Sequence, residues 1–355
     1  MAKQKYPWQD KICNNAQVGG IETSVLSDGP GVGVRVAWVN TGNLRYRVIL
    51  DKCADIDQAF YNEHSLSWLS PAGLRRPRPD SAHDFEWLYS FAGGLLATCG
   101  LTHAGGPEKD DSGERGLHGR ISNIPATVES IVQPNPMAGK LNMSITTVTS
   151  QSRLFGECLQ IRRTISSRIG KGTIKVHDEV TNRGPLPSPH MLIYHCNFGW
   201  PLVDEGTEIL YKGKCESRGM KQDNMLFNAK HDYKTCQPPL EVHKGAESCG
   251  FAKVPSDKKG ICTIGLNNKN IGLALMMKYS KKTLPWMCNW QHWSFGDYVC
   301  ALEPGTNPPI GQIGAKKKKQ LVMLEPGETR AYDLELTALT SQREIDKFVK
   351  AAGGK

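Results

Sequence analysis

The sequence predicts an all-β protein built mainly from antiparallel strands. Three observations support this expectation. Segments rich in β-branched residues recur along the 355-residue chain, polar or Gly-containing turns separate them, and only the C-terminus carries a convincing helix pattern. Alternation of apolar with polar residues over a short segment is typical of a half-buried strand. Because short turns join several of these segments, we expect neighbouring strands to run antiparallel.

The first two strands are expected to form a hairpin. Val32, Val34 and Val36 alternate with smaller or polar residues, and the alternation resumes over residues 44–50. Residues 40–43, Asn-Thr-Gly-Asn, have the composition of a turn. The pattern predicts a two-stranded antiparallel unit near the N-terminus.

Longer strands follow in the middle of the chain. Three β-branched segments at residues 141–149, 159–167 and 173–181 are separated by polar or Gly-containing turns. They predict an antiparallel meander. Further strands are expected at residues 261–266, 271–277, 298–302, 320–324 and 331–336.

A short helix is expected to close the chain. Ser341 with Glu344 fits a capping box, residues 345–349 carry an apolar stripe, and Gly353 supplies a stop signal. The convincing helix signals are confined to this segment.

Composition indicates a folded protein without membrane or secretory segments. Lys and Arg number 44 against 35 Asp and Glu, so 44 − 35 gives a net charge of +9. With no internal repeat and no linker-like stretch, we expect a single domain over residues 1–355. No stretch reaches the ~18 apolar residues of a membrane helix. The N-terminus has no apolar signal region, so a secretory leader is not expected.

Cysteine and charge patterns exclude several other classes. Eleven cysteines, an odd number without a C-x-x-C pair, favour reduced thiols in the cytoplasm over disulfides or a zinc site. Basic residues form only one run, Lys316–Lys319, so nucleic acid is not an expected partner. Asp51, Asp55 and Asp57 lack the glycine and glutamate of a calcium loop, so no metal is expected there.

Long Gly-, Pro- and Asp-rich loops are where binding groups tend to lie on a β scaffold. Such loops are expected at residues 70–83, 105–119 and 304–314. Within the second of these loops, glycines flank His118 and Arg120 follows two positions later. In an extended segment these two side chains face the same way, which predicts that both point into one cavity.

Two further segments could supply acid–base groups. His190 and His195 are five residues apart, so on a strand they face opposite sides and only one is expected in a site. Glu303 ends an apolar strand, where desolvation raises a carboxyl pKa toward the range of a general base. Trp290 and Trp293 offer flat surfaces on which a sugar can stack.

These segments resemble the aldose 1-epimerase (galactose mutarotase) superfamily, and more closely its uncharacterised aldose-1-epimerase-family branch. Residues 177–202 are similar to the segment that leads to the family's catalytic histidine, and residues 302–309 (LEPGTNPP) to that of its catalytic glutamate. Residues 116–126 (GLHGRISNIPA) resemble the segment with a substrate-binding histidine. The stretch 98–107 and the region of Asp55 resemble the uncharacterised branch. The resemblance implies a large antiparallel β-sandwich, the galactose mutarotase-like supersandwich.

The resemblance also implies roles for individual residues. His195 and Glu303 are the implied catalytic pair, with Glu303 taking the proton of the anomeric hydroxyl and protonated His195 giving one to the ring oxygen. No cofactor is required. The expected substrate-binding residues are His118, Arg120, Arg76, His103, Asn197, Trp290 and Gln291.

Three functions remain open on the sequence alone. The first is an isomerase that interconverts sugar anomers by ring opening. The second uses the same base to remove a C–H proton beside a carbonyl, as a keto-sugar isomerase or epimerase, either without a metal or with one held by His103, His118 and Glu303. The third is a sugar-binding protein without turnover. In each case we expect a monomer or homodimer that binds a monosaccharide or sugar derivative.

Overall fold

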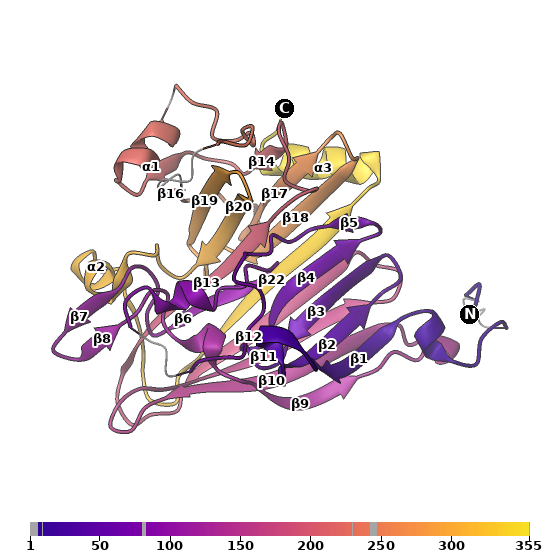
Figure 1. Cartoon of the computed structure of the whole chain (residues 1–355), viewed down its shortest axis with the longest axis horizontal. Helices are drawn as coiled ribbons and strands as arrows, with labels where there is room; N and C mark the ends of the chain where they lie inside the picture. The colour runs from indigo at the N-terminus through magenta and orange to yellow at the C-terminus, as the bar shows by residue number, and fades with distance from the viewer. Residues whose placement is uncertain (1–5, 9, 80–82, 229, 242–246, 355) are drawn as a thin grey trace.

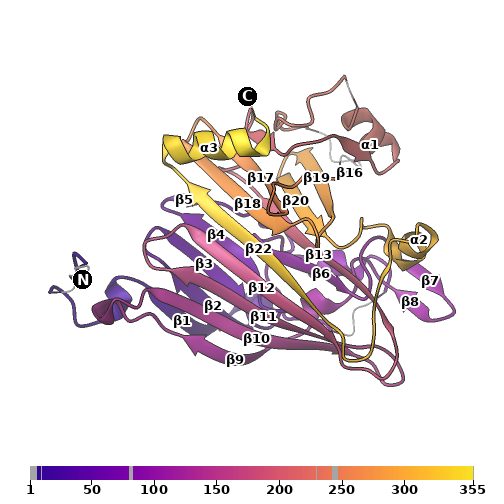
Figure 2. The ribbon, with the colours of Figure 1, turned by 180° about the vertical axis from the view of Figure 1, so that it is seen from behind.

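The structure, a computed structural model, describes residues 6–8, 10–79, 83–228, 230–241 and 247–354. Strands dominate it, as predicted. In the described residues they form a five-stranded, an eight-stranded and a seven-stranded sheet and one small hairpin. Figures 1 and 2 show the five-stranded sheet stacked on the eight-stranded sheet, the arrangement of a β-sandwich.

The two stacked sheets are antiparallel throughout. The five-stranded sheet contains, in spatial order, β1 (Gly20–Val25), β2 (Arg35–Asn40), β3 (Leu44–Ile49), β4 (Asp55–Tyr61) and β5 (His64–Ser65). The eight-stranded sheet contains β14 (Glu208–Leu210), β17 (Ile261–Asn268), β18 (Leu273–Ser280), β22 (Thr329–Leu339), β12 (Thr173–Asn182), β11 (Cys158–Arg168), β10 (Asn142–Ser152) and β9 (Thr127–Val132). The predicted hairpin is β2–β3, and the predicted meander is β10–β11–β12.

The third sheet carries most of the predicted site residues. Its order is β15 (Cys215–Ser217), β16 (Ser248–Ala252), β19 (Trp286–Ser294), β20 (Asp297–Gly305), β13 (Ser188–Phe198) and β21 (Val322–Leu324), and β6 (Ala97–Leu101) also pairs with β13. The small hairpin joins β7 (Glu108–Asp110) to β8 (Gly113–Arg115).

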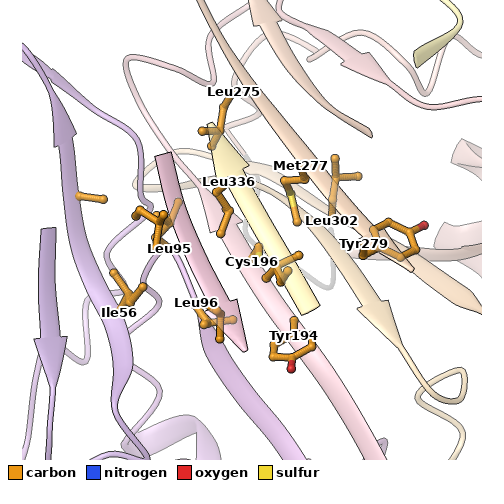
Figure 3. Packing of buried hydrophobic residues seen from close by; sticks show 14 of the residues in the cluster. Ile56, Leu95, Leu96, Tyr194, Cys196, Leu275, Met277, Tyr279, Leu302 and Leu336 are labelled. Atoms are coloured by element: carbon orange, nitrogen blue, oxygen red, sulfur yellow. The ribbon is translucent and has the colours of Figure 1, made fainter. Parts of the chain in front are cut away.

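One hydrophobic core connects the three sheets. Ile56 of β4, Tyr194 of β13, Leu275 of β18 and Leu302 of β20 belong to the same cluster of buried side chains. Figure 3 shows these side chains converging between the ribbons. Burial of this apolar surface is the main contribution that favours folding.

The C-terminal helix is present, but its predicted capping box is not. Helix α3 spans Gln342–Ala352, and Gly353 ends it in a left-handed conformation with φ of 85°. The Ser341 side chain makes no capping hydrogen bond, so that detail of the prediction is wrong. Two short helices were not predicted, α1 (Lys221–Leu226) and α2 (Gly311–Lys317). Helices of six or seven residues depend on tertiary packing and leave little sequence signal.

A buried ion-pair network fixes β6 and β13 to the eight-stranded sheet. Arg163 of β11 forms a bidentate pair with Asp178, at 2.9 and 2.8 Å, and contacts Asp55 at 3.0 Å. Asp55 accepts hydrogen bonds from the Thr98 backbone and hydroxyl on β6. The Tyr194 hydroxyl of β13 donates to Asp178 at 2.7 Å. The strand that carries His195 is therefore anchored on its core face.

The other acidic residues of the N-terminal segment also have structural partners. Asp51 pairs with Arg35 and Asp57 with Arg47. All eleven cysteines are free thiols. In the part of the chain that the structure describes, no helix is long and apolar enough to span a membrane.

Candidate functional site

The structure brings His195 and Glu303 together although 108 positions separate them in the sequence (303 − 195). They lie on β13 and β20, which pair side by side, with Cys196 opposite Leu302. Nε2 of His195 is 3.2 Å from Oε1 of Glu303. The residues are only 5% and 3% exposed, so the pair is almost completely shielded from solvent. His190 faces the other side of β13, where its ring bonds Leu101 and Tyr332.

Aromatic rings enclose the His195 imidazole. The ring centroids of Phe91, Trp290, His118 and Trp87 lie 5.4, 5.6, 5.8 and 6.3 Å from that of His195. The rings come from the 66–96 segment, the 116–120 turn and β19. Aromatic faces of this kind are the surfaces on which the C–H groups of a sugar stack.

This dry environment shifts the pKa values of both groups toward the neutral form. Burial raises the pKa of Glu303 to about 8. Burial also lowers the pKa of His195 to about 4. At pH 7 the pair therefore holds one proton, and that proton resides on Glu303 rather than on His195. This protonation is the reverse of the one expected from the resemblance, because both groups are too poorly hydrated to favour an ion pair.

Two atoms of the pair are left for a ligand. In the described structure Nδ1 of His195 and Oε1 of Glu303 are buried and have no hydrogen-bond partner that meets normal geometry. Buried polar atoms normally have a hydrogen-bond partner, and a functional role is one explanation for an exception. Oε1 of Glu303 also lies 3.2 Å from the other ring nitrogen of His195, Nε2, so the two groups approach each other while each keeps an unused polar atom.

A hydrogen bond followed by two ion pairs fixes the Trp290 side chain. Its indole Nε1 donates to Glu247 at 2.8 Å, and Arg218 donates to the other oxygen of Glu247 at 2.7 Å. Arg218 also forms a bidentate pair with Asp223, which is fully buried. The same groups act on Glu303, because Glu247 raises its pKa and Arg218 lowers it.

His118 and Arg120 do not point into one cavity, and the predicted extended segment is wrong. His118 and Gly119 have φ values of 57° and 72°, so the chain turns there. The His118 ring packs against Trp87, with centroids 4.9 Å apart. Arg120 instead directs its guanidinium toward the carbonyl of Ser152, at 3.5 Å. Only the histidine of this motif faces the pair.

Gln291 is separated from Trp290 by the alternation of β19. Neighbouring side chains on a strand point to opposite faces. Trp290 lies on the face of Glu303, whereas Gln291 is completely buried on the other face, bonded to Tyr233, Asn289 and Trp293. Gln291 is thus part of the core, together with Trp293.

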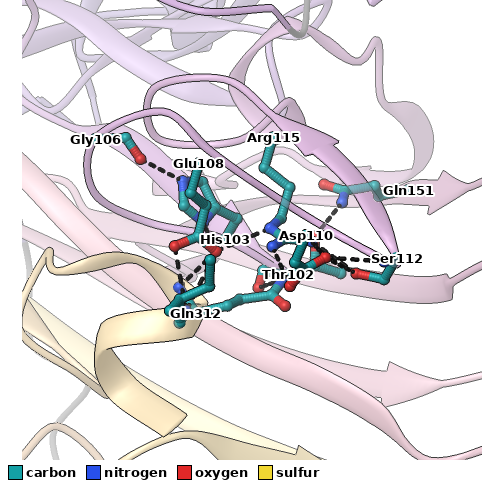
Figure 4. Close-up of polar contacts among 10 residues, drawn as sticks. Thr102, His103, Gly106, Glu108, Asp110, Ser112, Arg115, Gln151 and Gln312 are labelled. Atoms are coloured by element: carbon teal, nitrogen blue, oxygen red, sulfur yellow. Dashed lines mark hydrogen bonds and ion pairs between the residues drawn. The ribbon is translucent and has the colours of Figure 1, made fainter. Parts of the chain in front are cut away.

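His103 belongs to a separate polar network, drawn in Figure 4. Its Nε2 is 2.9 Å from the carbonyl of Gly106, and its Nδ1 is 3.4 Å from Glu108. Glu108 also accepts from Arg115 and from the Gln312 backbone. The network ties the β7–β8 hairpin to α2. Nε2 of His103 is thus engaged away from the pair, and Nδ1 faces Glu108 without a hydrogen bond.

The last two predicted residues have structural contacts. Arg76 is exposed, and its Nε donates to the carbonyl of Val32 in the loop between β1 and β2. Asn197, two positions after His195, donates to the carbonyls of Gly94 and His195 at 3.0 Å. Asn197 thereby fixes the loop that precedes β6 against β13.

The metal-assisted function required a ligand set of His103, His118 and Glu303. The described residues contain no group of three or more His, Cys, Asp or Glu side chains arranged to hold a metal ion. His103 lies in the network of the β7–β8 hairpin, with Nε2 on the Gly106 carbonyl and Nδ1 facing Glu108.

Several residues at the site were not predicted. They are Trp87, Phe91, Cys288, Glu247 and Arg218. Cys288 could have been found by counting across the tight β19–β20 hairpin, whose register places it directly opposite Glu303. The two aromatic residues follow a predicted long loop, and aromatic residues near such a loop are a usable but weak signal.

Comparison with known proteins places the chain in a family. A family model described as a domain of unknown function (DUF4432) matches residues 31–338, which is most of the chain. The chain belongs to the DUF4432 family. None of the curated proteins compared with it matches in sequence.

Solved structures confirm the fold of this DUF4432 protein. One from Klebsiella pneumoniae, described as a "putative aldose 1-epimerase", has a TM-score of 0.85 at 22% identity, covering 96% of this chain and 91% of that chain. A galactose mutarotase-like protein from Clostridium acetobutylicum has a TM-score of 0.60 at 12% identity, covering 90% of this chain and 98% of that chain. The predicted resemblance and the supersandwich fold are thus confirmed, and at these identities the similarity shows the fold alone.

Proposed function

We propose that this protein is an isomerase that interconverts the anomers of a sugar through His195 and Glu303. The observation that carries the proposal is the 3.2 Å approach of Nε2 to Oε1 between two paired strands, within a wall of aromatic rings. Anomer exchange needs one group that accepts a proton and one that donates a proton, both within reach of O1 and O5 of a pyranose. A pair that holds one proton between two sites meets that need.

The proposed reaction has two symmetrical halves. One group of the pair takes the proton of the O1 hydroxyl while the other protonates the ring oxygen O5, and the C1–O5 bond breaks to give the open-chain aldehyde. After rotation about C1–C2, the ring closes on the other face of the carbonyl and both protons return. Each residue therefore acts once as donor and once as acceptor, so the pair works with its single proton on either residue.

The experiment measures anomer exchange and carbon labelling together. Freshly dissolved α-anomers of a panel of aldoses are followed by polarimetry, and the products formed in D2O are analysed by NMR. We expect faster mutarotation of at least one sugar, with no deuterium bound to carbon. Deuterium at C2 would instead show that the base removes a C–H proton, as a keto-sugar isomerase does. Calorimetric binding of a sugar without turnover would make the protein a sugar-binding protein.

The pH dependence of this activity follows from the two shifted pKa values. The one-proton state is lost when His195 is protonated near pH 4 and when Glu303 ionises near pH 8. We expect a bell-shaped profile of kcat/KM with its plateau between these values, and the limbs report the pair rather than either residue alone. If activity already begins to fall as the pH drops to 6, the lowered pKa of His195 is contradicted.

Glu247→Gln tests the charges behind Trp290. Glu247 raises the pKa of Glu303, so removal of its charge is expected to move the alkaline limb to lower pH. Loss of the anionic acceptor for the Trp290 indole should also raise KM more than it lowers kcat, because the indole is a binding surface. Glu216→Gln, an exposed site on β15, is the control and should change neither. An unchanged alkaline limb would show that the charge of Glu247 does not influence the ionisation of Glu303.

A further inference from the structure

A cavity lies apart from the His195–Glu303 pair. Its volume is about 730 Å³, and it is enclosed by the β7–β8 hairpin, the β10–β11 turn and the β12–β13 turn. His195, Glu303, His118 and Trp290 are not among its lining residues. It is large enough for a small organic ligand.

The inner wall of this cavity is polar and well ordered by hydrogen bonds. Gln151 is 1% exposed, and its amide donates to the Thr102 hydroxyl and accepts from the Leu101 backbone. Gln312 donates to the Thr102 carbonyl. Figure 4 shows these side chains beside Arg115. A wall whose polar groups are already fixed needs little reorganisation on binding.

Positive charge is in excess around the cavity. Four arginines line it, namely Arg115, Arg120, Arg153 and Arg183. Only two glutamates do so, Glu114 and Glu157. Arg115 is neutralised by Glu108 and Asp110, and Arg153 lies 3.3 Å from Glu157.

Arg120 and Arg183 are the unpaired members of this set. Within the described residues neither has a carboxylate within ion-pair distance, and the guanidinium of Arg120 meets only the Ser152 carbonyl, at 3.5 Å. Two permanently charged, planar guanidinium groups that line the same cavity offer donors suited to a phosphate or carboxylate.

The rim of the cavity is apolar. Leu154, Phe155 and Leu186, on the β10–β11 and β12–β13 turns, are 81%, 98% and 72% exposed and line the same space. Large apolar side chains that are exposed together beside a charged cavity typically mark a binding surface. An anion with an apolar body would contact both the arginines and this rim.

We propose that this cavity binds a small organic anion, a phosphate or carboxylate group carried on an apolar body, with Arg120 and Arg183 as the anchors. The site is independent of the proposed sugar chemistry, because it shares no side chain with the His195–Glu303 pair. Its polar wall would receive oxygen atoms of the ligand, and Phe155 would cover the apolar part.

Isothermal titration at low salt tests the proposal with three probes: phenyl phosphate, benzoate and inorganic phosphate. We expect saturable one-to-one binding of phenyl phosphate or benzoate, and the comparison of the two identifies the anionic group. Arg120→Gln and Arg183→Gln should each weaken binding about tenfold or more, the loss typical of one charge-assisted contact. Phe155→Ser should weaken phenyl phosphate binding but leave inorganic phosphate binding unchanged.

Two control variants show whether a loss of binding is specific to this cavity. Arg343→Gln removes an exposed charge on α3 and should leave binding unchanged. Glu303→Gln should also leave it unchanged, which separates this site from the pair. The proposal is overturned if neither organic probe binds at about 10 mM, which corresponds to only a few kcal/mol. It is equally overturned if Arg343→Gln weakens binding as much as Arg120→Gln, or if Glu303→Gln abolishes it.

Discussion

Glu303→Gln is expected to slow anomer interconversion by a factor of ~10²–10⁴, the contribution typical of a positioned acid–base group. The amide has the size of the carboxyl group and fits the same space on β20, but it cannot exchange a proton with the sugar. His195→Gln should cost a similar factor. The double variant should be little worse than either single one, because the two groups act as a unit. Polarimetry of the best substrate measures all three.

The fold of Glu303→Gln should be intact and more stable than the wild type at alkaline pH. The folded-state pKa of Glu303 is raised from 4.5 to about 8. Its contribution to stability is therefore greatest below pH 4.5 and is lost as the pH rises toward 8, because ionisation is easier in the unfolded chain. Glutamine has no such titration, so the difference in Tm should grow from pH 4.5 to pH 8.

Controls separate catalysis from structure in this experiment. Glu179→Gln, at an exposed carboxyl group paired with Arg162, should keep full activity and the wild-type pH dependence of Tm. Full activity in Glu303→Gln would remove Glu303 from the reaction. A variant that is inactive and also less stable at pH 8 would show instead that the carboxyl group is ionised and structural.

Local patterns were sufficient to predict much of the sheet structure. The segments expected at residues 141–149, 159–167 and 173–181 became β10, β11 and β12, because alternation is imposed residue by residue on each strand. The pairing of β13 with β20 is different in kind. It joins residues about a hundred positions apart, and no local pattern in the sequence encodes it. The proximity of His195 to Glu303 was expected only through the resemblance.

The errors at the site have specific physical causes. An extended segment would place Arg120 beside His118 in one cavity, but His118 adopts a positive φ. Residues other than glycine rarely adopt this conformation, so the sequence does not reveal it. The prediction that Gln291 binds substrate together with its neighbour Trp290 is wrong, because alternation on β19 places adjacent side chains on opposite faces. The rings of Trp87 and Phe91 reach His195 through loop packing, which depends on the whole fold.

Arg163→Met is expected to be the most destabilising single substitution considered. Arg163 is 1% exposed and neutralises two buried carboxylates, Asp178 at 2.8 Å and Asp55 at 3.0 Å. Its removal leaves both carboxylates without the cation that neutralises them, and loss of one member of a buried pair typically costs ~3–5 kcal/mol. The neighbouring Arg162 pairs with exposed glutamates on the opposite face of β11, so Arg162→Met should cost less than ~1 kcal/mol. Urea unfolding followed by circular dichroism measures both.

The network of Arg163, Asp55 and Asp178 also connects stability to the strand that carries His195, and a rescue experiment tests this connection. Asp55 holds Thr98 of β6, and Asp178 holds Tyr194 of β13, one position before His195. If the unpaired charges cause the loss, adding Asp55→Asn and Asp178→Asn to Arg163→Met should recover part of the stability, since neutral amides are cheaper to bury. Any recovered protein should regain anomer exchange, because the catalytic groups are untouched. A loss equal to that of Arg162→Met, or no rescue by the amides, would show that packing around Arg163 rather than its charge anchors β13.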